Sequence, residues 1–264
     1  IIPLANPAKR IELESDNQFE FDGNRSMFLK GTNEPIPEFM AKKLIEFIDN
    51  GISTEALVNF WKHLLLNPNK AVRTQLYGFL EHNGHPITDG GYFLAYKAVN
   101  TQKKYDKETG DEVQSWSYDE ETGERIEQVV NQQTVFKPFH SGDYGMKIIF
   151  GEPVVMPREE CDCDPNTTCS SGLHVGSMEY VGDFGHSNAK AILEVLVSPR
   201  NVVAVPTDYN NTKMRCCEYY PVCISEGEND KIYLESDYNP FDKASLDAEI
   251  EQFAKDRAEQ INSL

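Results

Sequence analysis

Three stretches between residues 36 and 83 carry apolar side chains at the spacing of an α-helix. In the first, Met40, Leu44, Phe47 and Ile48 lie three or four residues apart, which places them on one helical face. The second follows Ser53, which is suited to cap a helix. Its apolar stripe consists of Leu57, Phe60, Trp61, Leu64 and Leu65. The third carries Val72, Leu76, Phe79 and Leu80. The pattern predicts three short helices with brief connections.

From Gly90 onward, short apolar runs bounded by turn residues replace the helical period. Such runs occupy residues 91–99, 147–156, 173–175, 191–197, 201–205 and 213–224. The start of the chain also alternates in character, and Asp22-Gly23 is suited to a tight hairpin turn. The pattern predicts small β-hairpins within residues 9–30 and a larger sheet between residues 90 and 224.

A near-repeat interrupts the sheet region. "YDKETGDEV" at Tyr105–Val113 and "YDEETGERI" at Tyr118–Ile126 each place an E-T-G turn between polar flanks. Residues 101–133 contain few apolar side chains and contribute little to a core. We predict an exposed hairpin insertion or a mobile loop there.

The tail ends in an amphipathic pattern formed by Leu246, Ile250, Phe253 and Ile261, with Ser245 as the expected cap. This helix is expected to pack on the domain or to offer its apolar face to a partner. The fold class is therefore α+β, with a small helical module followed by a mostly antiparallel sheet domain, N-terminal β-hairpins and a C-terminal helix. The predicted segments are 1–34 (hairpins), 35–85 (helical module), 86–224 (sheet domain) and 225–264 (acidic tail).

Charge and composition narrow the classes of partner. The 264 residues include 43 acidic and 25 basic side chains, so the net charge is −18. A chain this acidic repels phosphate backbones, and nucleic acid is not an expected partner. No apolar run approaches the roughly 20 residues of a membrane-spanning helix. Six cysteines are too few for a disulfide scaffold. We therefore expect reduced thiols in a cytosol, with an oxidised extracellular particle as the alternative.

The stretch "CDCDPNTTCSSGLHV", Cys161–Val175, concentrates polar and thiol side chains. Cys161, Cys163, Cys169 and His174 offer four ligands of the types that zinc prefers. A C-x-C pair in an extended chain, however, directs its two thiols to opposite faces. Cys169 and His174 are also the residue types of a nucleophile pair.

Asp162, Asp164 and Asn166 have the spacing that opens a calcium-binding EF-hand loop. Thr167 stands where that loop needs glycine, and Leu173 where it needs a glutamate. Asp, Asn, Ser and Thr also bond their own backbone in turns, which explains the composition without a ligand. We interpret the stretch as a structured turn that borders the main polar cleft and holds no zinc. The zinc, calcium and thiolate alternatives stay open, and no cofactor is predicted.

The order of three segments resembles a known family. The segments are "LYGFLEHNGHPITDGGYFLAYKAV", "VVMPREECDCDPNTTCSSGLHVGSMEYVGDFG" and "AILEVLVSPRNVVAVPTDYNNTKMRCCEYYPV". Together they are similar to the C-terminal half of the rIIB rapid-lysis proteins of T-even phages, from about Pro35 to about Val222. The resemblance implies a phage protein that acts inside the infected cell, affects lysis inhibition and counters a prophage exclusion system. It also implies a larger partner near the inner membrane.

Polar motif residues that flank apolar strands are candidates for one shared site. The predicted ligand or partner cleft contains Lys97, Asp162, Asp164, Cys169, Ser171, His174, Asp208, Asn210, Lys213 and Arg215. Lys213 and Arg215 are two residues apart on a strand, so their side chains share a face that suits a carboxylate or a phosphate. Internal salt bridges are the alternative role for these two cations.

A weaker resemblance links the sheet segments to ADP-ribosyltransferase-like folds. Lys97 stands where those enzymes carry an arginine, and Glu194 and Glu218 are the two candidates for their catalytic glutamate. This resemblance implies a site that holds a nucleotide-like ligand without transferring it.

The predicted function is that of a phage accessory protein of rIIB type, and an enzyme is the less favoured class. The expected partner is a protein, either an rIIA-like phage protein or a second copy of this chain. The expected location is the host cytoplasm, at the inner membrane face through the partner. The alternatives are a nucleotide-binding protein or enzyme of ADP-ribosyltransferase type and a virion-associated structural component.

Overall fold

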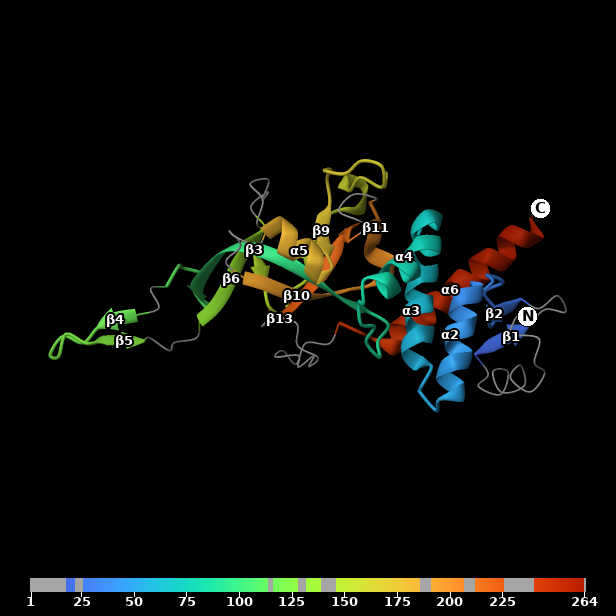
Figure 1. Cartoon of the computed structure of the whole chain (residues 1–264), viewed down its shortest axis with the longest axis horizontal. Helices are drawn as coiled ribbons and strands as arrows, with labels where there is room; N and C mark the ends of the chain where they lie inside the picture. The colour runs from blue at the N-terminus through green and yellow to red at the C-terminus, as the bar shows by residue number, and fades with distance from the viewer. Residues whose placement is uncertain are drawn as a thin grey trace. The chain divides into compact units, whose positions relative to one another are not determined.

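The computed structural model describes residues 18–21, 26–113, 116–127, 132–138, 146–185, 191–206, 212–225 and 240–263. The chain forms two compact units. Unit 1 comprises Ile1–Thr74, Ile87–Tyr92 and Phe241–Leu264, and unit 2 comprises Gln75–Pro86 and Phe93–Pro240. Figure 1 labels their helices and strands. The four-segment division made from the sequence stays a prediction.

Unit 1 is mainly helical. It contains the hairpin β1 (Phe19–Phe21) and β2 (Met27–Leu29), and the helices α2 (Glu38–Asp49), α3 (Glu55–Leu65) and α6 (Lys243–Asn262). The helix α4 (Lys70–His82) begins in unit 1, and its residues from Gln75 onward belong to unit 2. The three helices predicted between residues 36 and 83 are thus confirmed. Every residue of α3 from Leu57 to Leu65 is buried, so this helix forms the centre of the unit.

The capping predictions were wrong in detail. The N-cap of α3 is Thr54, one residue after Ser53, whose hydroxyl oxygen accepts a hydrogen bond from the Glu55 amide at 3.2 Å. The N-cap of α6 is Asp242, whose carboxylate accepts from the amides of Ala244 and Ser245 at 3.0 and 3.3 Å. Because Ser245 donates to this cap, the helix begins earlier than its apolar stripe indicated.

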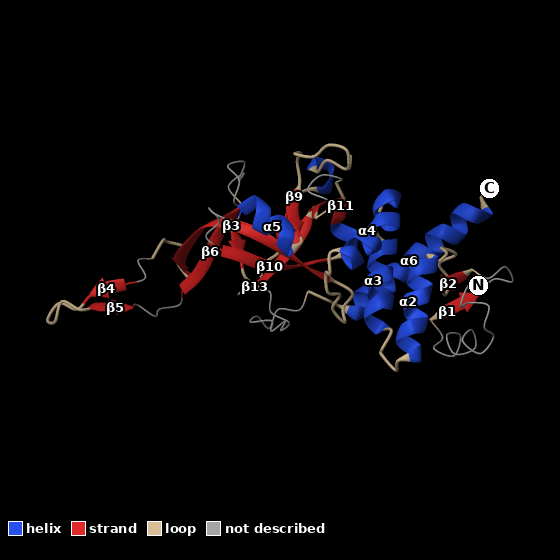
Figure 2. Ribbon diagram, in the orientation of Figure 1, coloured by secondary structure: helices blue, strands red, loops and turns tan. Residues whose placement is uncertain are grey.

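Unit 2 is built on one antiparallel sheet, whose strands are red in Figure 2. The strand order is β11-β12-β9-β3-β10-β13-β8, and β6 pairs with β3 and β7. The strands are β3 (Phe93–Asp106), β6 (Gln132–Pro138), β7 (Ile148–Ile149), β8 (Val154–Val155), β9 (Leu173–Gly176), β10 (Ala191–Val197), β11 (Val202–Ala204), β12 (Lys213–Cys216) and β13 (Glu218–Ile224). The helix α5 (Met178–Gly185) lies beside β3 (Figure 1). Val181 of α5 and Ala98 of β3 belong to one buried apolar cluster. Ser177 accepts from the Tyr180 amide at the start of α5. The α+β fold class is confirmed.

The apolar run at residues 213–224 forms two strands rather than one. A bend at Cys217 separates them, because β12 pairs with β9 and β11 whereas β13 pairs with β10 and β8. Cys217 itself donates its amide to Asn201 and accepts at its carbonyl from Met156, so its backbone bonds leave both ladders. Apolar periodicity cannot reveal such a change of partner.

The near-repeat forms two turns with the same hydrogen bonds. In the first, the Asp106 carboxylate accepts from the amides of Glu108 and Thr109 at 2.8 and 2.9 Å. In the second, the Asp119 carboxylate accepts from the two corresponding amides at 2.9 and 2.7 Å. The glycine of each turn has a positive φ, 72° at Gly110 and 67° at Gly123. The second turn connects β4 (Trp116–Tyr118) to β5 (Arg125–Glu127), and the first follows the end of β3. Both turns are exposed, as the polar composition predicted.

In the part of the chain that the structure describes, no helix is both long and apolar enough to cross a membrane.

His85 is a buried titratable group in unit 2. Its ring stacks on Phe79 with centroids 5.5 Å apart, and its Nδ1 lies 2.8 Å from the Leu94 carbonyl oxygen, so Nδ1 carries the hydrogen. Nε2 is buried without a hydrogen-bond partner. Burial lowers the pKa of His85 from 6.5 to about 4, against the opposing effect of the Leu94 hydrogen bond.

We expect the free energy of unfolding to fall as the pH drops from about 6.5 to about 4. In that window the unfolded chain binds a proton that native His85 does not accept, which costs up to about 3 kcal/mol. The variant His85→Asn keeps a donor for Leu94 but cannot titrate, so the difference between its pH–stability curve and that of the parent isolates His85. Parallel curves would exclude this role.

Candidate functional site

Residues 161–172, here called the Cys-Asp loop, form a closed surface loop. The Asp162 amide donates to the Ser171 carbonyl at 2.9 Å, which joins the two ends of the loop. The Ser171 hydroxyl donates to the Glu160 carbonyl at 2.5 Å, which fixes the same end to the preceding turn. Compact loops with adjoining ends are frequent sites of function.

Inside the loop, the acidic residues form local turns. The Asp162 carboxylate accepts from the Asp164 amide at 2.8 Å, and the Asp164 carboxylate accepts from the Asn166 amide at 2.9 Å. Hydrogen bonds from the Ser170 side chain and then the Asp164 amide lower the pKa of Asp162, because they stabilise the charged carboxylate. These are the turn bonds expected of a loop rich in Asp, Asn and Thr.

Two buried cations hold the loop from beneath. Arg215 of β12 is 0% exposed, and its guanidinium donates to the carbonyl of Thr167 at 2.5 Å and to that of Asp164. Lys213 of β12 is 2% exposed, and its ammonium donates to the carbonyl of Thr168 at 2.5 Å. Gly172 leaves room for this arrangement, since a Cβ there would lie 3.3 Å from Cδ of Arg215. The two cations therefore face the loop backbone, and they are positioned to fix its shape.

The predicted site residues divide between the two faces of the sheet. Arg215 lies opposite His174 of β9 in the register, so the two share the face that carries the loop. Lys97 of β3 interacts electrostatically with Cys216. Because Cys216 follows Arg215 on the same strand, its side chain points to the other face of the sheet. The structure thus brings Lys213 and Arg215 into contact with the loop and places His174 on the same face of the sheet. The Lys97 side chain lies on the opposite face, where its ammonium meets the backbone of β9.

The Lys97 ammonium lies between a backbone carbonyl and an aromatic ring. It donates to the His174 carbonyl at 2.9 Å and lies 5.5 Å from the centre of the Tyr219 ring. Burial lowers the pKa of Lys97 to about 8, against the opposing effect of Cys216. The Tyr219 hydroxyl is buried without a hydrogen-bond partner, and burial raises its pKa well above the usual value.

Two of the predicted site residues are not described by the structure, and one arginine beside the loop was not predicted. Asp208 and Asn210 lie outside the described residues. Sequence reasoning missed Arg158, just before the loop, which donates to the carbonyls of Arg200 and Val202 at 2.8 and 2.9 Å. Its position in "MPREE", next to the thiol-rich stretch, is the only sequence signal that could have singled it out.

The thiols around the loop differ in exposure. Cys163 and Cys169 are exposed, and Cys161, Cys216, Cys217 and Cys223 are buried; none of the six forms a disulfide. Burial raises the pKa of Cys161 to about 11 and that of Cys216 further. Within the described ranges, no three His, Cys, Asp or Glu side chains are grouped so that they could hold a metal ion.

We expect a thiol reagent at pH 8 to label two of the six cysteines of the native chain rapidly. The two are Cys163 and Cys169, because the buried thiols combine poor access with a raised pKa. Peptide mass spectrometry after a timed reaction identifies the labelled residues, and unfolding in urea should release the other four. Labelling of Cys161 at the rate of Cys169 would contradict the burial described above.

Cys169→Ser should change the free energy of unfolding by less than about 0.5 kcal/mol, since this side chain is exposed.

Comparison with known proteins places the chain among phage proteins. The profile of a family described as Bacteriophage T4 protein rIIB matches residues 21–118 and 144–230, which include the helical module and the Cys-Asp loop. The chain belongs to the rIIB family. Protein rIIB of Enterobacteria phage T4 is 30% identical over 180 residues, which cover 68% of this chain and 46% of that relative. This rIIB-family chain therefore spans less than half of the length of the curated relative. No solved structure matches it. Most of the second E-T-G turn and the whole of α6 lie outside the family match.

Proposed function

We propose that this rIIB-family chain is a phage accessory protein that acts through protein–protein contacts in host takeover, lysis timing or counter-exclusion. The observation that carries the proposal is the Cys-Asp loop, whose backbone Lys213 and Arg215 hold from beneath while its outer surface stays exposed. A loop that is already ordered loses little conformational entropy when a partner binds, which favours a contact surface.

The outer surface of the loop is polar and carries few apolar groups. Its exposed residues are Cys163, Asp164, Asn166, Thr167, Thr168 and Cys169. Such a surface suits a polar partner contact, in which hydrogen bonds give specificity. The partner that the family relation favours is an rIIA-like phage protein, and through it the chain would lie in the host cytoplasm at the inner membrane face.

The test replaces the gene in its phage by variants and measures lysis timing together with co-purification of the rIIA-like protein. Thr168→Arg adds a large charged side chain to the exposed surface but leaves the Thr168 carbonyl free to accept from Lys213. It should weaken co-purification at least tenfold and shift lysis toward the time seen after deletion of the gene. The matched control is Glu121→Arg in the exposed second E-T-G turn, which should behave like the parent.

Three outcomes would contradict the proposal. A Thr168→Arg phage with parental lysis timing and co-purification would exclude the loop as the contact. Stoichiometric copies of the chain in purified virions would favour a structural component. Thermal stabilisation by millimolar NAD would favour a nucleotide-binding protein.

A further inference from the structure

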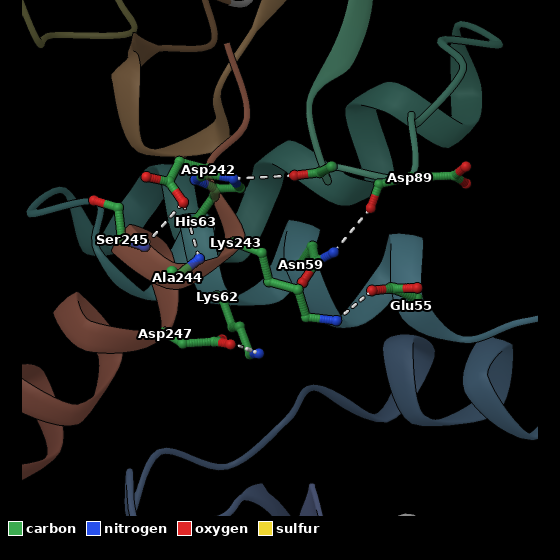
Figure 3. A network of polar contacts seen from close by, with 11 residues as sticks. Glu55, Asn59, Lys62, His63, Asp89, Asp242, Lys243, Ala244, Ser245 and Asp247 are labelled. Carbon is green, nitrogen blue, oxygen red and sulfur yellow. Dashed lines mark hydrogen bonds and ion pairs between the residues drawn. The ribbon is translucent and has the colours of Figure 1, made fainter. Parts of the chain in front are cut away.

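The first turns of α6 cover a polar face of α3 within unit 1 (Figure 3). Lys62 of α3 is only 8% exposed, and its ammonium forms an ion pair of 2.6 Å with Asp247 of α6. At the edge of this face, Lys243 pairs with Glu55 at 2.5 Å. A buried ammonium is costly without a partner, so this face of α3 requires an acidic group above Lys62.

The loop Ile87–Tyr92 completes the face. Asn59 donates to the Asp89 carbonyl at 2.8 Å, and Nε2 of His63 lies 3.1 Å from the Gly90 carbonyl oxygen, so α3 holds the loop at two points (Figure 3). Gly90 leaves space for an aromatic ring, since a Cβ there would lie 2.7 Å from Cγ of Phe241. We call this surface, formed by α3 and Ile87–Tyr92, the α3 face.

The residue types of α6 match the α3 face at several positions. The occupant has an aromatic residue at position 241, an acidic N-cap next to it, an apolar residue followed by an acid at 246 and 247, and an apolar residue at 250. Each of these features has its own contact: the ring lies on Gly90, the carboxylate pairs with Lys62, and Leu246 and Ile250 are buried. The pattern is that of an amphipathic helix with an acid beside its apolar stripe.

Few side chains of α6 are buried against the α3 face. Leu246 and Ile250 are its only buried residues, and Ile261 near its end is 50% exposed. In the ion pair at the rim, the side chains of Lys243 and Glu55 are 57% and 51% exposed, and exposed pairs stabilise little. Helices with few buried contacts open at low cost and are replaced readily.

The α3 face lies inside the part of the chain that matches the rIIB family, and α6 lies outside it. The α3 face lies within residues 21–118, which match the rIIB family, and α6 lies beyond residue 230, where the match ends. The surface thus lies in the part of the chain that the family shares, whereas the helix that covers it here lies outside the family match. We propose that the α3 face is a helix-binding surface for an acidic amphipathic helix of a partner protein, and that α6 is a built-in occupant which this partner displaces. The surface is distinct from the Cys-Asp loop, and the inference does not rest on the proposed function.

The experiment uses the full chain and a fluorescent peptide with the sequence of residues 240–263 as the probe. In the parent, the tethered α6 competes with the peptide at a high effective concentration and binding is weak. In the Asp247→Lys chain, the lysine repels Lys62 and α6 is released, so the parent peptide should bind at least tenfold more tightly. In the Lys62→Glu chain, the parent peptide should lose that binding, whereas a peptide carrying Asp247→Lys should recover it. The control chain Asp256→Lys, altered on an exposed part of α6, should bind like the parent.

Two results would overturn the inference. Equal binding of the peptide to all four chains, while hydrogen exchange shows α6 released in the Asp247→Lys and Lys62→Glu chains and held in the other two, would show that the α3 face does not select a helix. A stable dimer of the parent chain, seen by native mass spectrometry and lost in the Asp247→Lys chain, would assign the face to α6 of a second copy instead of a partner protein. Circular dichroism of each chain separates loss of binding from loss of folding.

Discussion

Gly91→Ala is expected to lower the free energy of unfolding of unit 1 by about 3–5 kcal/mol. A Cβ at Gly91 would lie 2.3 Å from the Phe60 amide nitrogen and 2.4 Å from the Asn59 carbonyl carbon. Both atoms belong to the backbone of α3, which cannot yield without breaking a buried helix. The residue also has a φ of +77°, which costs an alanine a further 1–2 kcal/mol, roughly.

The matched control for this prediction is Gly51→Ala. Gly51 has a similar φ of +66°, but nothing lies within 4 Å of the Cβ that alanine would add. It should therefore lose only the conformational term of about 1–2 kcal/mol. Urea unfolding compares the two variants, and hydrogen exchange of the α3 amides locates the damage. Equal losses in the two variants would show that the loop Ile87–Tyr92 can move away from α3.

Arg215→Met is expected to cost about 2–4 kcal/mol and to loosen the Cys-Asp loop. Methionine fills much of the same volume but cannot donate, so the carbonyls of Asp164 and Thr167 lose their partner. Relief of the buried charge offsets part of this cost. The substitution breaks no ion pair between Arg215 and a carboxylate of the described chain. The loss of the two carbonyl hydrogen bonds therefore outweighs the relief of the buried charge, and the free energy of unfolding falls.

Two measurements separate the loop from the rest of the unit. Hydrogen exchange at the Asp162 amide, which closes the loop, should accelerate more in Arg215→Met than exchange in the centre of β3. The control Arg125→Met removes an exposed arginine of β5 and should change the free energy of unfolding by less than about 0.5 kcal/mol. Unchanged protection of Asp162 in Arg215→Met would mean that Arg215 does not hold the loop.

Several local features could be predicted from the sequence because they depend on neighbouring residues. Apolar side chains at helical spacing located α2, α3 and α4. The matching E-T-G segments were expected in an exposed insertion, and they form two turns with equivalent bonds. Asx-type bonding was also the expected role of Asp162 and Asp164. In each case a period or a short-range hydrogen bond determines the structure.

The candidate site was harder to predict, because its contacts join strands that are distant in the sequence. Alternation showed that Lys213 and Arg215 share a face, and the register confirms it. It did not show that their donors face the backbone of residues 164–168 instead of a free anion site. Nor did it show that Lys97 occupies the opposite face, since that depends on the pairing of β3 with β9.

The sequence by itself determined the helical periods, the strand segments, the turn chemistry of the Cys-Asp loop and the membership of the rIIB family. Only the tertiary structure decided where the buried cations donate, which glycines permit close contact, and that Asp247 of α6 pairs with Lys62 of α3. The reason is physical: local patterns are set by the chain's own neighbours, whereas the partner of a buried charge is set by whichever distant backbone or carboxylate the packing brings within hydrogen-bond distance.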